Sequence, residues 1–241
     1  MNKIIDQNEW LNGLLDYARP PYFKGWTMFE KVWLLVFGGI IGGVTIYTGG
    51  SIASVVAALT GMVTVVLVAK RRISNYAWGV INVGIYGYLA LQGQLFGEVM
   101  LNWLFYLPSQ FVGYYVWKNN ISSGLVETNP VSKKGKVFLG LLSIGGIIAY
   151  ALFLQFLGGT LPLFDATSTV LSVIAQILMI KRMPEQWLLW AVVDIVSVYL
   201  WVTVFLATGT GLALAVMWLA YLVNTAYGYY MWSDRFEGVR G

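Results

Sequence analysis

Long apolar runs separated by short polar connections dominate the pattern of this chain. Eight such runs occur, at residues 29–48, 51–69, 76–92, 98–117, 137–157, 163–180, 186–206 and 212–232. Each is close to the roughly 20 residues that a helix needs to cross about 30 Å of hydrocarbon. The runs are too long, and alternate too little, for the strands of an outer-membrane barrel. The pattern therefore predicts an all-α polytopic membrane protein with eight transmembrane helices.

The basic residues indicate how these helices are oriented. All 15 Lys and Arg residues lie near the termini or in alternate connections: Lys3, Arg19, Lys24, Lys31, Lys70, Arg71, Arg72, Lys118, Lys133, Lys134, Lys136, Lys181, Arg182, Arg235 and Arg240. The positive-inside rule assigns that side to the cytoplasm, so we expect both termini to be cytoplasmic. Topology also accounts for the net charge of +4, and no nucleic-acid partner is expected.

The longest polar connection, residues 118–136, divides the chain into halves. The predicted parts are a cytoplasmic N-terminal segment with the pattern of an interfacial helix (1–28), an extra transmembrane helix (29–48), a first three-helix bundle (49–117), a cytoplasmic loop (118–136), a linker transmembrane helix (137–157), a second three-helix bundle (158–232) and a cytoplasmic tail (233–241).

The two bundles repeat each other in sequence. Residues of the first bundle recur 115 positions later in the second. Trp103 and Tyr106 recur as Trp218 and Tyr221, and the pattern Gly-Tyr-Tyr-x-Trp occurs at both 113–117 and 228–232. Upstream, a spacing of 112 pairs Trp78 with Trp190 and Asn82 with Asp194. Because the helix at 137–157 restores the chain direction, we expect the bundles to run parallel, with a ligand site between them near the middle of the membrane.

The residue inventory excludes several kinds of chemistry. The chain has neither Cys nor His, which excludes thiolate nucleophiles, Cys or His metal sites and His proton relays. A hydrolase needs a paired acid and base or an activated nucleophile, and one acidic residue among amides supplies neither. No cofactor and no enzymatic activity are expected; an intramembrane enzyme or a sensor is the remote alternative.

Asp194 is the residue from which the candidate site is built. It is the acidic residue that falls deep inside an apolar run, where a carboxylate costs on the order of 3 kcal/mol on insertion scales, and such residues typically face a cavity or a partner. Trp187 and Trp190 precede it at helical spacing and share its face. We therefore expect Trp187, Trp190 and Asp194 to contact a ligand.

Amide and aromatic residues in the other runs extend this site. The amides are Asn82, Gln110, Gln176 and Asn224, and the aromatic residues are Trp103, Tyr114 and Tyr221. Interhelical hydrogen bonds are the alternative role for the amides, and Trp117 and Trp232 are interpreted as interfacial belt residues. Aromatic walls with amides suit a flat ring that bears hydroxyls, and a cationic ring would gain a cation–π term of about 1–2 kcal/mol. Phosphorylated ligands are disfavoured, because no intramembrane Lys or Arg offsets Asp194.

These residues resemble the PnuC-type family of bacterial vitamin transporters. The resemblance covers about 29–232 and rests on Gln176, Trp187-Leu-Leu-Trp190, Asp194, Asn224 and the segment 75–82. It implies a SWEET-like fold with one extra N-terminal helix, a homotrimer in the bacterial cytoplasmic (inner) membrane, and alternating access. It also implies facilitated diffusion (uniport) of unphosphorylated nicotinamide riboside for NAD biosynthesis. Another flat-ring vitamin, thiamine or riboflavin, and coupling to protons remain the alternatives.

Overall fold

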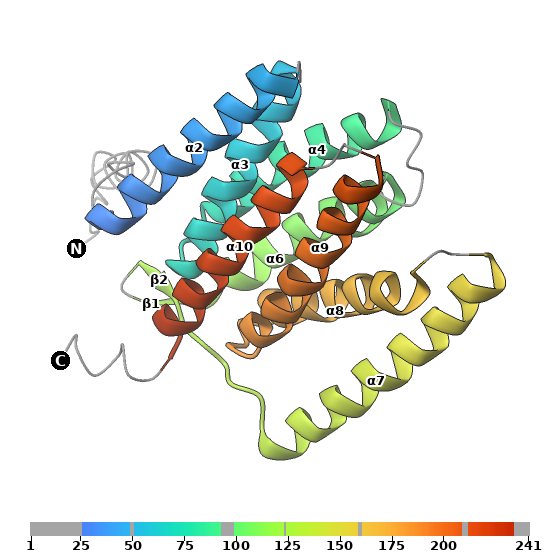
Figure 1. Cartoon of the computed structure of the whole chain (residues 1–241). Helices are drawn as coiled ribbons and strands as arrows, with labels where there is room; N and C mark the ends of the chain where they lie inside the picture. Colours follow the sequence, from blue (N-terminus) through green and yellow to red (C-terminus); the bar gives the residue numbers. More distant parts are fainter. Residues whose placement is uncertain are drawn as a thin grey trace, which may run out of the picture. The chain divides into compact units, whose positions relative to one another are not determined.

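The structure of the chain is a computed structural model that describes residues 26–48, 51–92, 99–122, 124–158, 161–208 and 212–233. Within these residues, helix covers each of the eight predicted apolar runs: α2 (Met28–Thr48), α3 (Ile52–Ala69), α4 (Asn75–Gln92), η1 (Leu101–Tyr106) continued by α6 (Leu107–Lys118), α7 (Lys133–Phe156), α8 (Pro162–Ile180), α9 (Gln186–Thr208) and α10 (Leu212–Met231). The connection after α6 contains a short antiparallel ribbon of β1 (Ile121–Ser122) and β2 (Leu125–Val126) (Figure 1).

Several of these helices have the length and composition of membrane spans. Among the described residues, five helical stretches are long and apolar enough to cross a membrane: Met28–Tyr47, Ile52–Ala69, Lys133–Phe156, Pro162–Ile180 and Gln186–Ala207. The mostly helical, membrane-spanning character predicted from the apolar runs is therefore confirmed.

The chain divides into two compact units, Met1–Val36 and Phe37–Gly241. The predicted interfacial segment at 1–28 lies outside the described residues except for its last three. In the first unit, α2 begins with a reciprocal cap: the Thr27 N–H donates to Glu30 Oε2 (2.7 Å), and the Glu30 N–H donates to Thr27 Oγ1 (3.2 Å). This capping box satisfies two N–H groups that a helix start otherwise leaves without partners.

In the second unit, the helices of the two halves pack in a closed ring. α3, α4 and α6 pack in chain order, and so do α8, α9 and α10. α6 then packs against α8, and α10 packs against α3, so the halves meet along two helix pairs. α7 packs against α8 at the edge of the bundle (Figure 1). Its apolar side chains, such as Phe138, Leu141 and Phe153, are exposed, as expected for a helix that faces lipid.

The helix made by η1 and α6 has a local irregularity that the apolar pattern does not predict. Pro108 lies in the first turn of α6 and has no N–H to donate to the carbonyl of Leu104, which its ring would also crowd. The backbone widens here into the π-helical turn η1, and the Leu107 N–H reaches back to the Asn102 carbonyl. Single π turns of this kind are frequent at functional sites.

The repeat is visible in the turns that join α3 to α4 and α8 to α9. Arg71 (φ 56°) and Arg182 (φ 63°) both adopt a positive φ, and their N–H groups donate to the carbonyls of Val68 and Met179, each at 2.9 Å. The spacing between these equivalent residues is 111. The predicted spacing of 112 is therefore wrong by one residue at this point, because it was set by matching like side chains. One residue turns an α-helix by about 100°. Because α4 and α9 are both continuous, residues paired at a spacing of 112 therefore point in directions that differ by about 100° in the two halves.

The corrected spacing changes which residues correspond in the two halves. Tyr76 is the counterpart of Trp187, and Val83, not Asn82, is the counterpart of Asp194. The carboxylate at Asp194 therefore has an apolar, buried equivalent. The halves thus repeat in backbone but differ in the chemistry they bring to the interior.

Candidate functional site

Asp194 lies inside the bundle with one hydrogen-bond donor beside it. Its side chain on α9 is 2% exposed, and its Oδ2 accepts a hydrogen bond of 2.7 Å from Thr225 Oγ1 on α10. A buried hydrogen bond to a charged group is among the stronger ones in proteins, and it holds the carboxylate in one orientation. The structure thus brings Asp194 into the interior, as predicted, and identifies Thr225 as its partner.

Two further amides make hydrogen bonds between the halves. Asn224 Nδ2 on α10 donates to the Val65 carbonyl on α3 at 3.1 Å, and Gln176 Nε2 on α8 donates to Ser109 Oγ on α6 at 2.9 Å. These contacts are related by the repeat, because Asn224 corresponds to Ser109 and Gln176 to Val65. Polar groups therefore join both of the helix pairs along which the halves meet.

Asn82 and Tyr221 approach each other over a glycine. Asn82 Nδ2 on α4 donates to the Ala57 carbonyl on α3 at 2.7 Å. A Cβ on Gly61 would lie 2.5 Å from Tyr221 Oη and 2.8 Å from Asn82 Nδ2. Gly61 therefore allows polar groups from α4 and α10 to come together above α3, and any larger residue there would displace them.

Gln110 and Asn224 each keep a carbonyl oxygen that accepts no hydrogen bond. Gln110 Nε2 donates to the Tyr106 carbonyl at 3.3 Å, and Gln110 Oε1 lies against Gly79. Because both amide nitrogens donate to backbone carbonyls, the assignment of oxygen and nitrogen is determined. Gln110 Oε1 and Asn224 Oδ1 are buried without a donor among the described residues. Both amide oxygens are therefore free to accept a hydrogen bond from a ligand.

Trp187 lies in an aromatic cluster with Tyr76, Trp117 and Trp232. Ring centroids are 5.2 Å apart for Tyr76 and Trp117, 5.9 Å for Trp117 and Trp232, and 6.1 Å for Trp187 and Trp232. All four side chains are buried, and Trp190 packs against the cluster while remaining half-buried. Trp190 is therefore placed between the aromatic cluster and Asp194, which follows it by one helical turn.

The indoles of Trp117 and Trp232 cross from one half to the other. Trp117 Nε1 donates to the Met179 carbonyl and Trp232 Nε1 donates to the Val68 carbonyl, both at 3.0 Å and both buried. These bonds are again related by the repeat. The interpretation of Trp117 and Trp232 as interfacial belt residues is therefore wrong, because their N–H groups are satisfied inside the protein.

Two predicted site residues lie farther from these groups. Trp103 Nε1 donates to the Gly84 carbonyl at 3.4 Å, and its ring lies against Gly87 on α4. Tyr114 is 39% exposed on the outer face of α6, so the structure does not bring it to the buried polar groups.

Sequence reasoning missed Thr225, Ser109 and Gly61. Hydroxyl groups are common in membrane helices, where they bond to their own backbone, as Thr60 does with the Val56 carbonyl (2.7 Å). Ser109 could have been found from the repeat, because it lies 115 residues before Asn224.

The apolar helices and the polar groups buried between two halves define a multi-pass membrane protein whose interior suits a water-soluble ligand. A family model described as nicotinamide mononucleotide transporter matches residues 51–234, and the chain belongs to this family of transporters. The resemblance predicted from the residues is thereby confirmed.

Named relatives and a solved structure agree with this assignment. The nicotinamide riboside transporter PnuC of Neisseria mucosa is 42% identical over 218 residues, which cover 88% of this chain and 83% of the relative. The protein of the same name from Haemophilus influenzae is 37% identical over 218 residues, covering 88% and 92%. A crystal structure of the vitamin B3 transporter PnuC superposes with a TM-score of 0.74 at 40% identity, covering 86% of this chain and 92% of that one.

Proposed function

We propose that this chain transports nicotinamide riboside across the membrane. The observation that carries the proposal is a set of buried acceptors: the Asp194 carboxylate, which accepts from Thr225, and the oxygens of Gln110 and Asn224, which have no donor among the described residues. Within the part of the chain that the structure describes, every Lys and Arg lies in a connection or in the first or last turn of a helix. Nicotinamide riboside is a cationic ring with carboxamide and ribose donors, so it matches a site that offers acceptors and one negative charge.

The same chemistry favours the riboside over its phosphorylated form. The family description names the mononucleotide, whereas the relatives are named for the riboside. A phosphate would enter an interior that contains Asp194, whereas the buried basic residues Lys70 and Arg71 lie in the turn between α3 and α4. Like charges repel strongly where water is excluded, so we infer that the mononucleotide is rejected.

Each residue of the proposed site has a role that follows from its position. Asp194 supplies the counter-charge to the ring, and Trp190, one turn away and half-buried, stacks on it. Trp187 bounds the site on the side of the aromatic cluster. Ribose and carboxamide donors bind Asn224 and Gln110, while the remaining residues shape the walls: Gln176, Asn82, Tyr221 and Trp103. The exposed Tyr114 is left outside the proposed site.

The proposed architecture has eight membrane spans. α3, α4 and α6 form one bundle, α8, α9 and α10 form a parallel second bundle, α7 inverts the chain between them in a SWEET-like manner, and α2 is the extra helix. Both termini lie in the cytoplasm of a bacterium, the protein lies in the inner membrane, and the assembly is a homotrimer. Transport is facilitated diffusion by rocking of the halves. Among the described residues of α3 to α10, Asp194 is the only buried carboxylate, and the chain has no His, so few stations exist for a proton relay.

Titration calorimetry on the detergent-purified protein tests the proposed cargo. We expect saturable binding of nicotinamide riboside and no binding of the mononucleotide. Thiamine is an informative competitor because it is also a cationic ring with a hydroxyl and an amine, and riboflavin is informative because it is neutral. Binding of thiamine or riboflavin in place of the riboside would overturn the cargo, and binding of the mononucleotide would overturn the argument from charge.

Replacing Thr225 with valine is expected to weaken riboside binding by about 5-fold. The change keeps the shape of the side chain but removes the hydroxyl that orients Asp194, a loss of about 1 kcal/mol. Thr225→Ser keeps the hydroxyl and should bind nearly as tightly as the parent. Calorimetry on both variants checks this; equal affinity of Thr225→Val and the parent would show that the hydrogen bond does not position the carboxylate for the ligand.

A further inference from the structure

The connection between the halves crosses from one repeated turn to the other. The Val126 N–H donates to the Arg71 carbonyl at 3.1 Å, and the Asn129 N–H donates to the Arg182 carbonyl at 2.8 Å. Arg71 and Arg182 are the equivalent positive-φ residues of the two halves. Residues 126–129 therefore bridge the halves at the end of the bundle that carries the basic residues.

The attachment to the first half is buried and the attachment to the second half is polar. Val126 is 1% exposed and belongs to the same buried core as the aromatic cluster, and the Glu127 N–H donates to the Asn120 carbonyl at 3.0 Å just past α6. On the second half, Arg182 Nη1 donates to the exposed Glu127 carbonyl at 3.1 Å. Exposed hydrogen bonds open more readily than buried apolar contacts. The bonds of Arg182 are thus the ones that part first.

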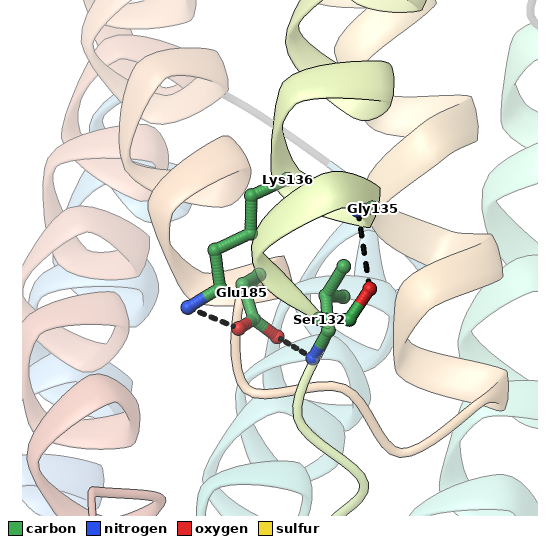
Figure 2. A network of polar contacts seen from close by, with 5 residues as sticks. Ser132, Gly135, Lys136 and Glu185 are labelled. Carbon is green, nitrogen blue, oxygen red and sulfur yellow. Dashed lines mark hydrogen bonds and ion pairs between the residues drawn. The ribbon is translucent and has the colours of Figure 1, made fainter.

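The start of α7 is tied to the second half. Glu185 accepts the Val131 N–H at 3.1 Å and pairs with Lys136 Nζ at 2.9 Å, while Ser132 Oγ caps the helix by accepting the Gly135 N–H at 3.2 Å (Figure 2). Residues 131–136 therefore remain with the second half if the halves separate. Any separation at this end is taken up within residues 127–129.

Several polar atoms in the aromatic cluster and in the residues next to it have no hydrogen-bond partner among the described residues. They are Asn75 Oδ1, Tyr76 Oη, both polar side-chain atoms of Gln186, and Trp187 Nε1, all buried and without a hydrogen bond among the described residues. Asn75 and Gln186 are equivalent first residues of α4 and α9. Separation of the halves here would let water reach these atoms, which favours opening. The buried bonds of Trp117 and Trp232 oppose this opening, and so do the hydrogen bonds of residues 126–129 to both halves.

We propose that residues 126–129 are a latch between the halves, and that release of Arg182 from Glu127 and Asn129 opens the aromatic cluster toward the basic side of the bundle. The inference rests on the proposed function in one respect, since a transporter that alternates access must open this end. The latch gives the connection between the bundles a role in the transport cycle beyond linking them.

The absence of cysteine from the chain makes an accessibility test direct. Ala69→Cys introduces a small reporter at a position that is 0% exposed within the core of the aromatic cluster, and its rate of maleimide labelling in purified protein reports opening. In this background, Arg182→Asn removes the guanidinium while tolerating the positive φ. Loss of its hydrogen bond should raise the labelling rate about 5-fold.

Matched controls distinguish opening at the latch from a general loss of stability of the protein. Lys181→Gln removes one positive charge from the neighbouring residue, whose ammonium makes no hydrogen bond or ion pair to a described residue, and should label at the parent rate. A second reporter, Ala57→Cys, is 4% exposed nearer the start of α3 and should not respond to Arg182→Asn. Equal labelling of Arg182→Asn and the parent, or faster labelling at both reporters, would overturn the latch.

A second variant keeps the latch testable if the first does not fold, and a ligand-free readout keeps this test separate from the test of the cargo. If Arg182→Asn does not yield folded protein, Arg182→Gly also lacks the guanidinium and accepts the positive φ without strain, and it should accelerate Ala69→Cys labelling in the same way. Labelling needs no ligand. Faster labelling in a protein that does not bind nicotinamide riboside would support the latch and overturn the cargo, and riboside binding with unchanged labelling would do the reverse.

Discussion

Replacing Asp194 with asparagine is expected to weaken nicotinamide riboside binding by about 10- to 150-fold, which corresponds to about 1.5–3 kcal/mol for a buried hydrogen bond to a charged group. Asparagine has the same shape, and its carbonyl oxygen can still accept the Thr225 hydrogen bond. The change therefore removes the charge and little else. Calorimetry gives the affinity, and uptake of labelled riboside into proteoliposomes should saturate only at correspondingly higher concentrations.

A second carboxylate provides the matched control for this result. Asp165 lies in the first turn of α8 and is exposed, so Asp165→Asn should bind the riboside as the parent does. A neutral analogue of the riboside, with carbon in place of the ring nitrogen, should lose much less affinity in Asp194→Asn than the cation does. If the cation and the neutral analogue lost the same factor, Asp194 would not be the counter-charge.

Truncating Trp232 to alanine is expected to lower the free energy of unfolding by about 3–5 kcal/mol, the range for removing a large buried aromatic side chain. Trp232 contacts Trp117 and Trp187, and its Nε1 donates to the Val68 carbonyl of the other half. The variant would leave a cavity and would lose a buried hydrogen bond between the halves. The fall should appear as a lower thermal midpoint of the purified protein.

Two companion variants separate the causes of this loss. Trp232→Phe keeps most of the ring and removes the N–H, so it should cost about 0.5–1.5 kcal/mol, the net value of one hydrogen bond, because the Val68 carbonyl still accepts the Arg71 N–H. Tyr229→Ala truncates an exposed aromatic residue on α10, three residues before Trp232, and should leave the midpoint nearly unchanged. A Trp232→Ala protein as stable as the parent would show that the aromatic cluster does not hold the halves together.

The helices were predictable because membrane insertion imposes a strong and simple requirement. The run at 29–48 became α2 (Met28–Thr48), and the run at 163–180 became α8 (Pro162–Ile180), since about 20 apolar residues without water must satisfy their backbone internally. Asp194 and the amides were predictable as buried polar groups for the same reason. Their helical spacing placed them inside but did not identify their partners.

The features that could not be predicted depend on backbone geometry and side-chain packing, which residue types alone do not determine. A tryptophan at the end of a span has the same sequence signal in an interfacial belt and in a buried cluster, so Trp117 and Trp232 were misassigned. The one-residue error in the repeat arose because Trp78 and Trp190 are alike in side chain but not equivalent in backbone. The hydrogen bonds from the Val126 and Asn129 N–H groups to the carbonyls of Arg71 and Arg182 are backbone features, and no side-chain pattern marks them.

Counterflow in proteoliposomes tests the central claim most directly. Vesicles that contain the purified protein are loaded with unlabelled nicotinamide riboside and diluted into labelled riboside without any ion gradient. We expect transient accumulation of the label by the parent protein, much less by Asp194→Asn at the same riboside concentration, and none when the mononucleotide replaces the riboside. Absence of accumulation by the parent, or accumulation only with an imposed proton gradient, would contradict facilitated diffusion of the riboside.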